Sequence, residues 1–185
     1  MTGPRGYHHG DLRRTLLAAA VEAITEAGPA ALSLRDLARR AGVSHAAPAH
    51  HFGDKAGLLT ALAVEGFDLL AAALCGAGDL LDAGVAYVRF AVGHRAHFEV
   101  MFRPELYRHD DPEVAAARER AGAALRAGVA ALPRDATAPD QDSDALAAWS
   151  IVHGFATLWL AGALPPRTGP DPEAAARTVI RRLFD

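Results

Sequence analysis

The stretch from Ser33 to Phe52 constrains what this chain can fold into more than any other part of it. It holds two short helix-forming runs joined by the turn Ala41-Gly42-Val43-Ser44. Ser33 and Ser44 are each predicted to cap the helix that follows, because a serine hydroxyl accepts hydrogen bonds from the free amides at a helix start. Gly42 tolerates the positive φ that such a turn requires. Two helices joined in this way form a helix-turn-helix, with an ordinary capped helical hairpin as the alternative.

The rest of the chain also favours helices. Ala, Leu, Arg and Glu dominate between the Gly and Pro breaks, and no segment has the alternating Val, Ile and Thr pattern of a strand. We predict an all-α fold, with an N-terminal three-helix domain over residues 1–57 and a larger helical domain over 58–185. About nine helices are expected, near 11–27, 33–40, 44–51, 54–76, 79–93, 96–102, 112–131, 143–163 and 171–184.

Charge is unevenly distributed along the chain. The net charge is −3, but residues 1–57 carry +2 and the remainder −5, which favours a nucleic-acid contact near the N-terminus. Cys75 is the only cysteine, so neither an intrachain disulfide nor a zinc site of several thiolates can form. The start lacks the apolar run of a secretory signal, and the apolar windows near 69–81 and 151–164 fall short of a membrane span. We therefore predict a cytoplasmic protein without a membrane partner.

The sequence offers no recognisable catalytic site. It has no Gly-x-Ser-x-Gly motif, no Gly-rich phosphate loop and no nucleophile at a recognisable spacing from a base. His94 and His97 are spaced so that they can share one helix face, but no third metal ligand accompanies them. We predict that the protein is not an enzyme and uses neither a metal nor another cofactor.

The stretch from Ser33 onward resembles the TetR family of bacterial transcriptional regulators. The matching residues are Ser33-Leu34-Arg35-Asp36-Leu37-Ala38, Ala41-Gly42-Val43-Ser44 and His51-Phe52-Gly53-Asp54-Lys55-Ala56-Gly57-Leu58-Leu59. The resemblance implies a homodimer that places two recognition helices in successive major grooves of a palindromic operator. It also implies that a small-molecule effector releases the protein, most often a repressor, from double-stranded DNA.

The resemblance and the residue types together indicate the DNA contacts. The resemblance implies phosphate contacts by Ser33, Ser44, His51 and Lys55, although a solvated surface lysine is the alternative for Lys55. Arginines on the outer side of the first helix would face phosphates, histidines of the second helix would read base edges, and its alanines would offer methyl contacts. The predicted set is Ser33, Arg35, Arg39, Ser44, His45, Ala46, Ala47, Ala49, His50, His51 and Lys55.

Two residues of the second helix depart from a simple match. The family usually has Tyr where this chain has Ala49, which removes a backbone contact that His50 could supply instead. Pro48 is expected at about the fourth helical position, where it would remove one backbone hydrogen bond and bend the helix. We expect neither change to abolish DNA binding.

The C-terminal part is similar to a regulatory-domain subtype with a Trp-x-x-x-His-Gly signature, at Trp149-Ser150-Ile151-Val152-His153-Gly154. Its aromatic, Met and His side chains could form an effector pocket, although such a set is more often a core. The candidates are Tyr87, Phe90, His94, Phe98, Met101, Phe102, Trp149 and His153.

The last two helices carry apolar faces that could form a four-helix interface between two subunits, or pack within one subunit. The candidates for this interface are Trp149, Val152, Phe155, Trp159, Val179, Ile180 and Leu183. Two further functions remain open. One is a DNA-binding architectural or recruitment protein without a ligand, and the other is a helical ligand-binding protein without a DNA function.

Overall fold

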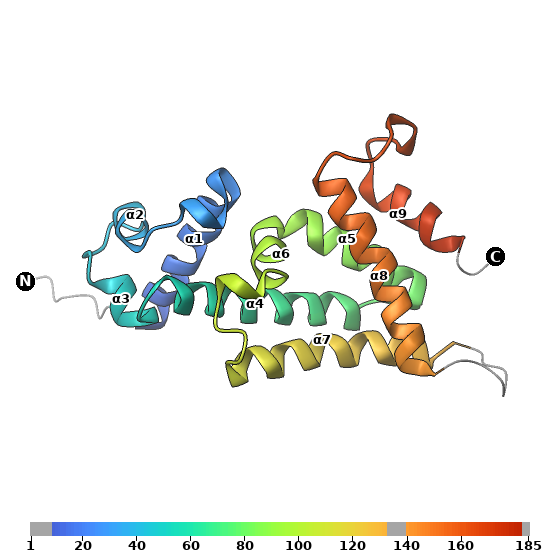
Figure 1. The fold of residues 1–185 in the computed structure, drawn as a ribbon, viewed down its shortest axis with the longest axis horizontal. Helices are drawn as coiled ribbons and strands as arrows, with labels where there is room; N and C mark the ends of the chain where they lie inside the picture. Colours follow the sequence, from blue (N-terminus) through green and yellow to red (C-terminus); the bar gives the residue numbers. More distant parts are fainter. Residues whose placement is uncertain (1–8, 133–139, 183–185) are drawn as a thin grey trace, which may run out of the picture. The chain divides into compact units, whose positions relative to one another are not determined.

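The computed structural model describes residues 9–132 and 140–182. Within these ranges the chain forms nine α-helices and two short 3₁₀ helices, with no strand (Figure 1). The prediction of an all-α fold is confirmed. The helices are α1 (His9–Ala31), α2 (Leu34–Arg40), α3 (Ala47–Phe52), α4 (Lys55–Cys75), α5 (Leu80–Gly93), α6 (Arg95–Met101), η1 (Pro104–Leu106), α7 (Pro112–Ala130), α8 (Gln141–Leu160), η2 (Pro166–Thr168) and α9 (Pro172–Arg181).

The chain divides into two compact units. The first comprises Met1–Glu65 and Ala96–Val114, and the second comprises Gly66–Arg95 and Ala115–Asp185. Helix α4 therefore starts in the first unit and ends in the second. Helix α6 and the turn η1 belong to the first unit, although they follow α5 in the sequence.

The first unit is built around the apolar stripe of α1. Leu16, Ala20 and Ile24 recur at helical spacing and are almost fully buried. Regular helical geometry breaks at Gly28, whose φ of 76° is open to glycine but strained for other residues. The end of the first helix, predicted near residue 27, corresponds to this break.

Helices α2 and α3 meet at the predicted turn. Ser33 caps α2 by accepting a hydrogen bond from the amide of Asp36 at 3.1 Å, as the sequence indicated. Gly42 has a φ of 66°, which confirms its role in the turn. Leu37 and Ala38 of α2 are buried, and the small side chain of Ala38 permits the close crossing of the two helices.

The prediction that Ser44 caps α3 is wrong. The helix begins at Ala47, its N-cap position is Ala46, and no side chain caps it. Pro48 consequently lies in the first turn rather than at the predicted fourth position. An amide there has no helical partner, so proline removes no hydrogen bond and its fixed φ suits the helix start. The late start of α3 is thus the conformation that accommodates Pro48.

Helix α4 has the length and apolar composition of a membrane-spanning helix, but 56% of its most apolar window is buried inside the protein. Leu58, Leu59 and Leu62 are almost fully buried. This burial accounts for the composition, since a core helix and a membrane helix pass the same test of hydropathy.

The second unit is a layered arrangement in which α5 packs against both α8 and α9 (Figure 1). Gly84 of α5 lets these helices approach closely, because a Cβ placed there would lie 2.8 Å from Ile180 Cδ1 and 3.3 Å from Val152 Cγ1. Two ion pairs at the surface join α5 and α9. Arg89 pairs with Glu173 at 2.5 Å, and Arg177 pairs with Asp82 at 2.7 Å.

Candidate nucleic-acid interface

Most of the predicted DNA-contacting side chains of the helix-turn-helix are exposed to solvent. Ser33, Arg35, Arg39, Ser44, His45, Ala46, Ala49 and His50 are exposed, whereas Ala47, His51 and Lys55 are half-buried. On the inner side of α3, Pro48 and Phe52 are buried. Helix α3 therefore has one face fixed to the unit and one face open to a partner, which is the arrangement that a recognition helix requires.

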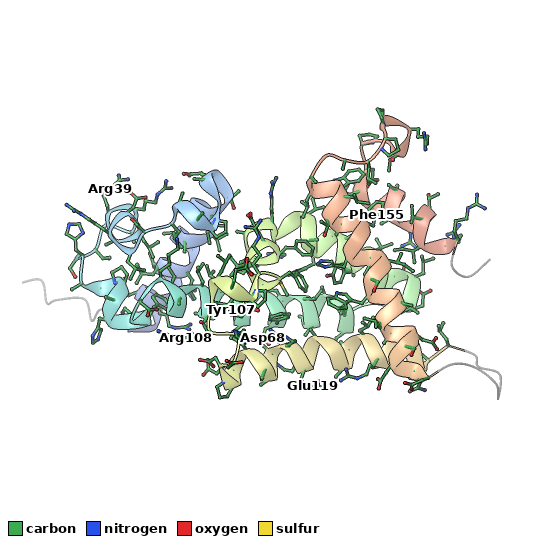
Figure 2. The ribbon with its side chains drawn as sticks, in the orientation of Figure 1. Arg39, Asp68, Tyr107, Arg108, Glu119 and Phe155 are labelled. Carbon is green, nitrogen blue, oxygen red and sulfur yellow. The ribbon has the colours of Figure 1, made fainter. Side chains whose placement is uncertain are left out.

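Two neighbouring arginines of α2 serve different purposes. The side chain of Arg39, labelled in Figure 2, is 71% exposed. Its guanidinium donates to Asp36 within the same helix. Arg40 instead bridges two helices, because it donates to Asp36 at 3.1 Å and to Glu26 of α1 at 2.7 Å. Hydrogen bonds from Arg39 and Arg40 lower the pKa of Asp36, and Arg40 lowers the pKa of Glu26. The guanidinium of Arg39 is thus the one presented outward.

The start of α4 combines a cap with a cation. Asp54 accepts a hydrogen bond from the amide of Gly57 at 2.8 Å, which is the largest cause of its lowered pKa. The ammonium of Lys55 donates to the carbonyl of Ala30 at 2.9 Å. This bond ties the start of α4 to the end of α1 and occupies one of three ammonium donors, so the others remain able to reach a phosphate.

Aromatic contacts hold the last turn of α3. The rings of His50 and His51 pack edge to face, with centroids 5.6 Å apart, and His51 also packs against Phe52. The guanidinium of Arg13 lies 5.5 Å from the centroid of Phe52, within cation–π range. Arg13 of α1 therefore contacts the end of the recognition helix.

In the second unit, three of the predicted ligand-contacting residues come together. The hydroxyl of Tyr87 lies 2.8 Å from Nδ1 of His153, and Nε1 of Trp149 donates to the same hydroxyl at 3.2 Å. Burial raises the pKa of Tyr87 and lowers that of His153. Both changes favour the neutral forms.

The remaining ligand candidates are distributed over both units. Phe90 and His94 stack in the second unit with centroids 5.3 Å apart. Phe98 and Phe102 pack edge to face at 5.1 Å in the first unit, to which buried Met101 also belongs. The described residues contain no group of three or more side chains suited to hold a metal ion.

The candidates for a subunit interface are divided by burial. Val152, Phe155 and Ile180 are buried within the second unit, so each of these side chains packs in its own subunit. Trp149 and Val179 are exposed and Trp159 is half-buried, while Leu183 lies outside the described residues. Leu146 and Leu158, which belong to the apolar face predicted for the same helix, are exposed as well. The predicted stripe alone does not reveal which of its edges faces solvent.

Comparison with known proteins identifies the family. Residues 16–62 match the family described as "Bacterial regulatory proteins, tetR family", and residues 80–183 match "Tetracyclin repressor-like, C-terminal domain". The second match alone covers more than half of the chain. The chain belongs to the TetR family of bacterial regulatory proteins. The predicted resemblance is confirmed at the level of this family, whose members are transcriptional regulators that bind DNA.

Solved structures of TetR-family proteins and of an uncharacterised protein have the same fold. A protein of unknown function from Rhodococcus sp. RHA1 is 33% identical with a TM-score of 0.79, over 98% of this chain and 97% of its own. The TetR-family regulator PfmR from Thermus thermophilus is 25% identical with a TM-score of 0.67, over 90% and 94%. LfrR from Mycobacterium smegmatis, solved with proflavine, is 19% identical with a TM-score of 0.61, over 95% and 97%, which concerns the fold alone. Comparison with the curated proteins finds no match.

Proposed function

We propose that this TetR-family regulator is a repressor that binds a palindromic operator as a homodimer and is released by a small-molecule effector. The observation that carries the proposal is the contrast between the buried face of α3, with Pro48 and Phe52, and the exposed side chains of His50 in the helix and His45 in the turn before it. In this assignment residues 1–57 bind DNA, and residues 58–185 bind the effector and the second subunit.

We propose that one set of residues contacts phosphates and another set contacts bases. Arg35, Arg39 and Lys55 neutralise phosphates, which positions the protein but conveys no sequence. His45 and His50 reach base edges in the major groove, where donor and acceptor patterns differ between base pairs. Ala46, Ala47 and Ala49 leave space for thymine methyl groups.

The subunit interface is proposed on α8 and α9. The large exposed apolar side chains among the described residues are Leu146 at 58%, Trp149 at 37%, Leu158 at 47% and Val179 at 42%, all on these two helices. Apolar surface of this kind is removed from water when two copies meet, and an isologous dimer suits a two-fold symmetric operator. Trp149 of the proposed interface is also a member of the hydrogen-bonded trio.

The effector is proposed to contact the trio of Tyr87, Trp149 and His153, which we also assign to the Trp-x-x-x-His-Gly subtype of regulatory domain. The trio offers hydrogen-bonding groups without a formal charge, and Tyr87 shares its helix with the buried aromatic side chain of Phe90. An uncharged polar effector fits the trio better than an ion, because the neutral trio itself offers no formal charge to compensate the desolvation of an ion.

The proposal is tested by selecting DNA from a random-sequence pool with the wild-type chain and measuring the affinity of the selected duplex at several salt concentrations. We expect a two-fold symmetric site and a steep salt dependence. Arg39→Ala and Lys55→Ala should weaken binding to all sequences alike, whereas His45→Ala should change the selected sequence.

Sedimentation analysis tests whether the chain forms a dimer. A thermal-shift screen of small molecules tests whether it binds an effector. Effectors that bind only the folded protein raise its melting temperature and should lower its affinity for the selected duplex. Binding to DNA without any effector response would favour an architectural or recruitment protein. Failure to select any sequence would instead favour a ligand-binding protein without a DNA function.

A further inference from the structure

Arg108 is anchored to the start of α4 through both its backbone and its side chain. Its backbone amide donates to Oγ1 of Thr60 at 3.0 Å, and Thr60 in turn donates to the carbonyl of Ala56. Its guanidinium Nη2 lies 3.0 Å from each carboxylate oxygen of Asp54. Figure 2 places Arg108 next to Tyr107 in the segment that follows η1.

The segment that presents Arg108 is itself fixed. The hydroxyl of Tyr107 is buried and donates to the carbonyl of Met101 at 2.9 Å, which closes the turn between α6 and Arg108. His97 of α6 lies 3.2 Å from Glu65 of α4. All of these residues belong to the first compact unit, so Arg108 is part of the body that carries α3.

The corner between α3 and α4 has space for this guanidinium only because residue 57 is glycine. A Cβ at Gly57 would lie 2.7 Å from Nη1 of Arg108 and 2.0 Å from the carbonyl oxygen of Phe52. Phe52 ends the recognition helix, and Gly53, with a φ of 77°, leads to Asp54. The guanidinium therefore lies over the connection that sets the direction of α3.

We infer that Arg108 is a positioning residue for DNA recognition, which acts through Asp54 to hold the corner between α3 and α4. It contacts neither base nor phosphate in this role. The inference rests on the proposed DNA-binding role of α3. The ion pair is exposed, with 50% of the Arg108 side chain and 62% of the Asp54 side chain accessible, so we expect a modest change in DNA affinity, about two- to five-fold.

The test compares Arg108→Gln with Arg103→Gln, which removes the same charge from the same segment and breaks a comparable ion pair with Glu99. Affinity is measured on a duplex selected from a random pool by the wild-type chain. Arg108→Gln should weaken binding about two- to five-fold with the salt slope unchanged, whereas Arg103→Gln should not weaken it. In an Asp54→Asn background, which keeps the cap acceptor for Gly57, Arg108→Gln should cause no further loss.

Three results would overturn the inference. The first is an equal loss of DNA affinity in Arg108→Gln and Arg103→Gln. The second is a salt slope reduced by about one in Arg108→Gln, which would indicate a phosphate contact. The third is a loss of affinity for Arg108→Gln that adds to that of Asp54→Asn.

Amide exchange of residues 47–57 in the DNA-free protein gives a measure that does not depend on operator binding. It should be faster in Arg108→Gln than in Arg103→Gln, and equal rates would refute the inference even if no DNA is bound. Should Arg108→Gln fail to fold, Arg108→Lys keeps the charge but not the two-oxygen contact and is compared instead.

Discussion

The hydroxyl of Tyr87 lies 2.8 Å from Nδ1 of His153, although the two residues stand 66 positions apart in the chain. The same hydroxyl accepts a hydrogen bond from the indole of Trp149, so its hydrogen is available to donate to the imidazole. When the hydroxyl donates to Nδ1, the imidazole is neutral and carries its proton on Nε2. Burial favours that form, because it lowers the pKa of His153 and raises that of Tyr87.

Stability should therefore fall when His153 is forced to accept a proton. Its pKa in the folded protein lies below that of an unfolded histidine, about 6.5. Between these two values the unfolded chain binds more protons, so the free energy of unfolding rises with pH. The contribution is fully present above about pH 6.5 and is lost as the pH falls below it.

Urea denaturation of the wild type and of His153→Asn between about pH 8 and pH 5 checks this expectation. Asparagine offers an acceptor at the δ position without titrating in this range. The wild type should lose more stability than the variant as the pH falls. Parallel pH profiles for the two proteins would contradict the assignment of a neutral, half-buried imidazole.

The two adjacent arginines of α2 should differ in their effects when each is replaced by alanine. Arg39→Ala removes an exposed guanidinium and should make the salt dependence of DNA affinity shallower by about one. Arg40→Ala breaks the bridge between Glu26 and Asp36, so it should lower the melting temperature more than Arg39→Ala does. Each variant is the control for the other, and identical changes in both measurements would show that the division of roles is wrong.

Gly57 should be the glycine of the first unit that is least tolerant of a side chain. A Cβ would lie 2.0 Å from the carbonyl oxygen of Phe52, a backbone atom that cannot move without opening the corner between α3 and α4. We expect Gly57→Ala to reduce the free energy of unfolding by about 1–3 kcal/mol or more. Gly93→Ala is the control, since no described atom beyond its chain neighbours and its own helix backbone lies within 4 Å of the added Cβ. Equal denaturation midpoints for the two variants would contradict this close approach at the corner.

The parts of this fold that depend on neighbours in sequence could be predicted from the sequence. Ser33 and Asp54 act as caps, and Gly42 makes the turn, because each role is fixed within three or four residues. Ser44 also has cap chemistry, but Pro48 fits only near a helix start and moves that start to Ala47. A competing local preference thus decided where α3 begins.

The parts that depend on distant contacts could not be predicted in this way. The sequence separates Asp54 from Arg108 by 54 positions, and no spacing rule joins them. The helical spacing of Val152 and Phe155 fits an interface residue as well as a core residue. Only the packing of α8 on α5 places them in the core. Which side chains meet, and which edge of a stripe stays exposed, follows from tertiary packing.

Gly154 gives a direct test of the proposed subunit interface. It lies inside α8, four residues before exposed Leu158, and among the described residues no atom beyond its chain neighbours and the backbone of its own helix lies within 4 Å of a Cβ placed there. Within one subunit, Gly154→Ala should stabilise the helix by about 1 kcal/mol. If a second α8 crosses at this point, the added methyl group should instead raise the dissociation constant of the dimer.

Gly128→Ala is the matched control, because its Cβ would make only an ordinary contact with Leu80 at 3.5 Å inside the second unit. Sedimentation equilibrium should show weaker dimerisation for Gly154→Ala alone, and an unchanged dissociation constant would place the interface away from this face of α8.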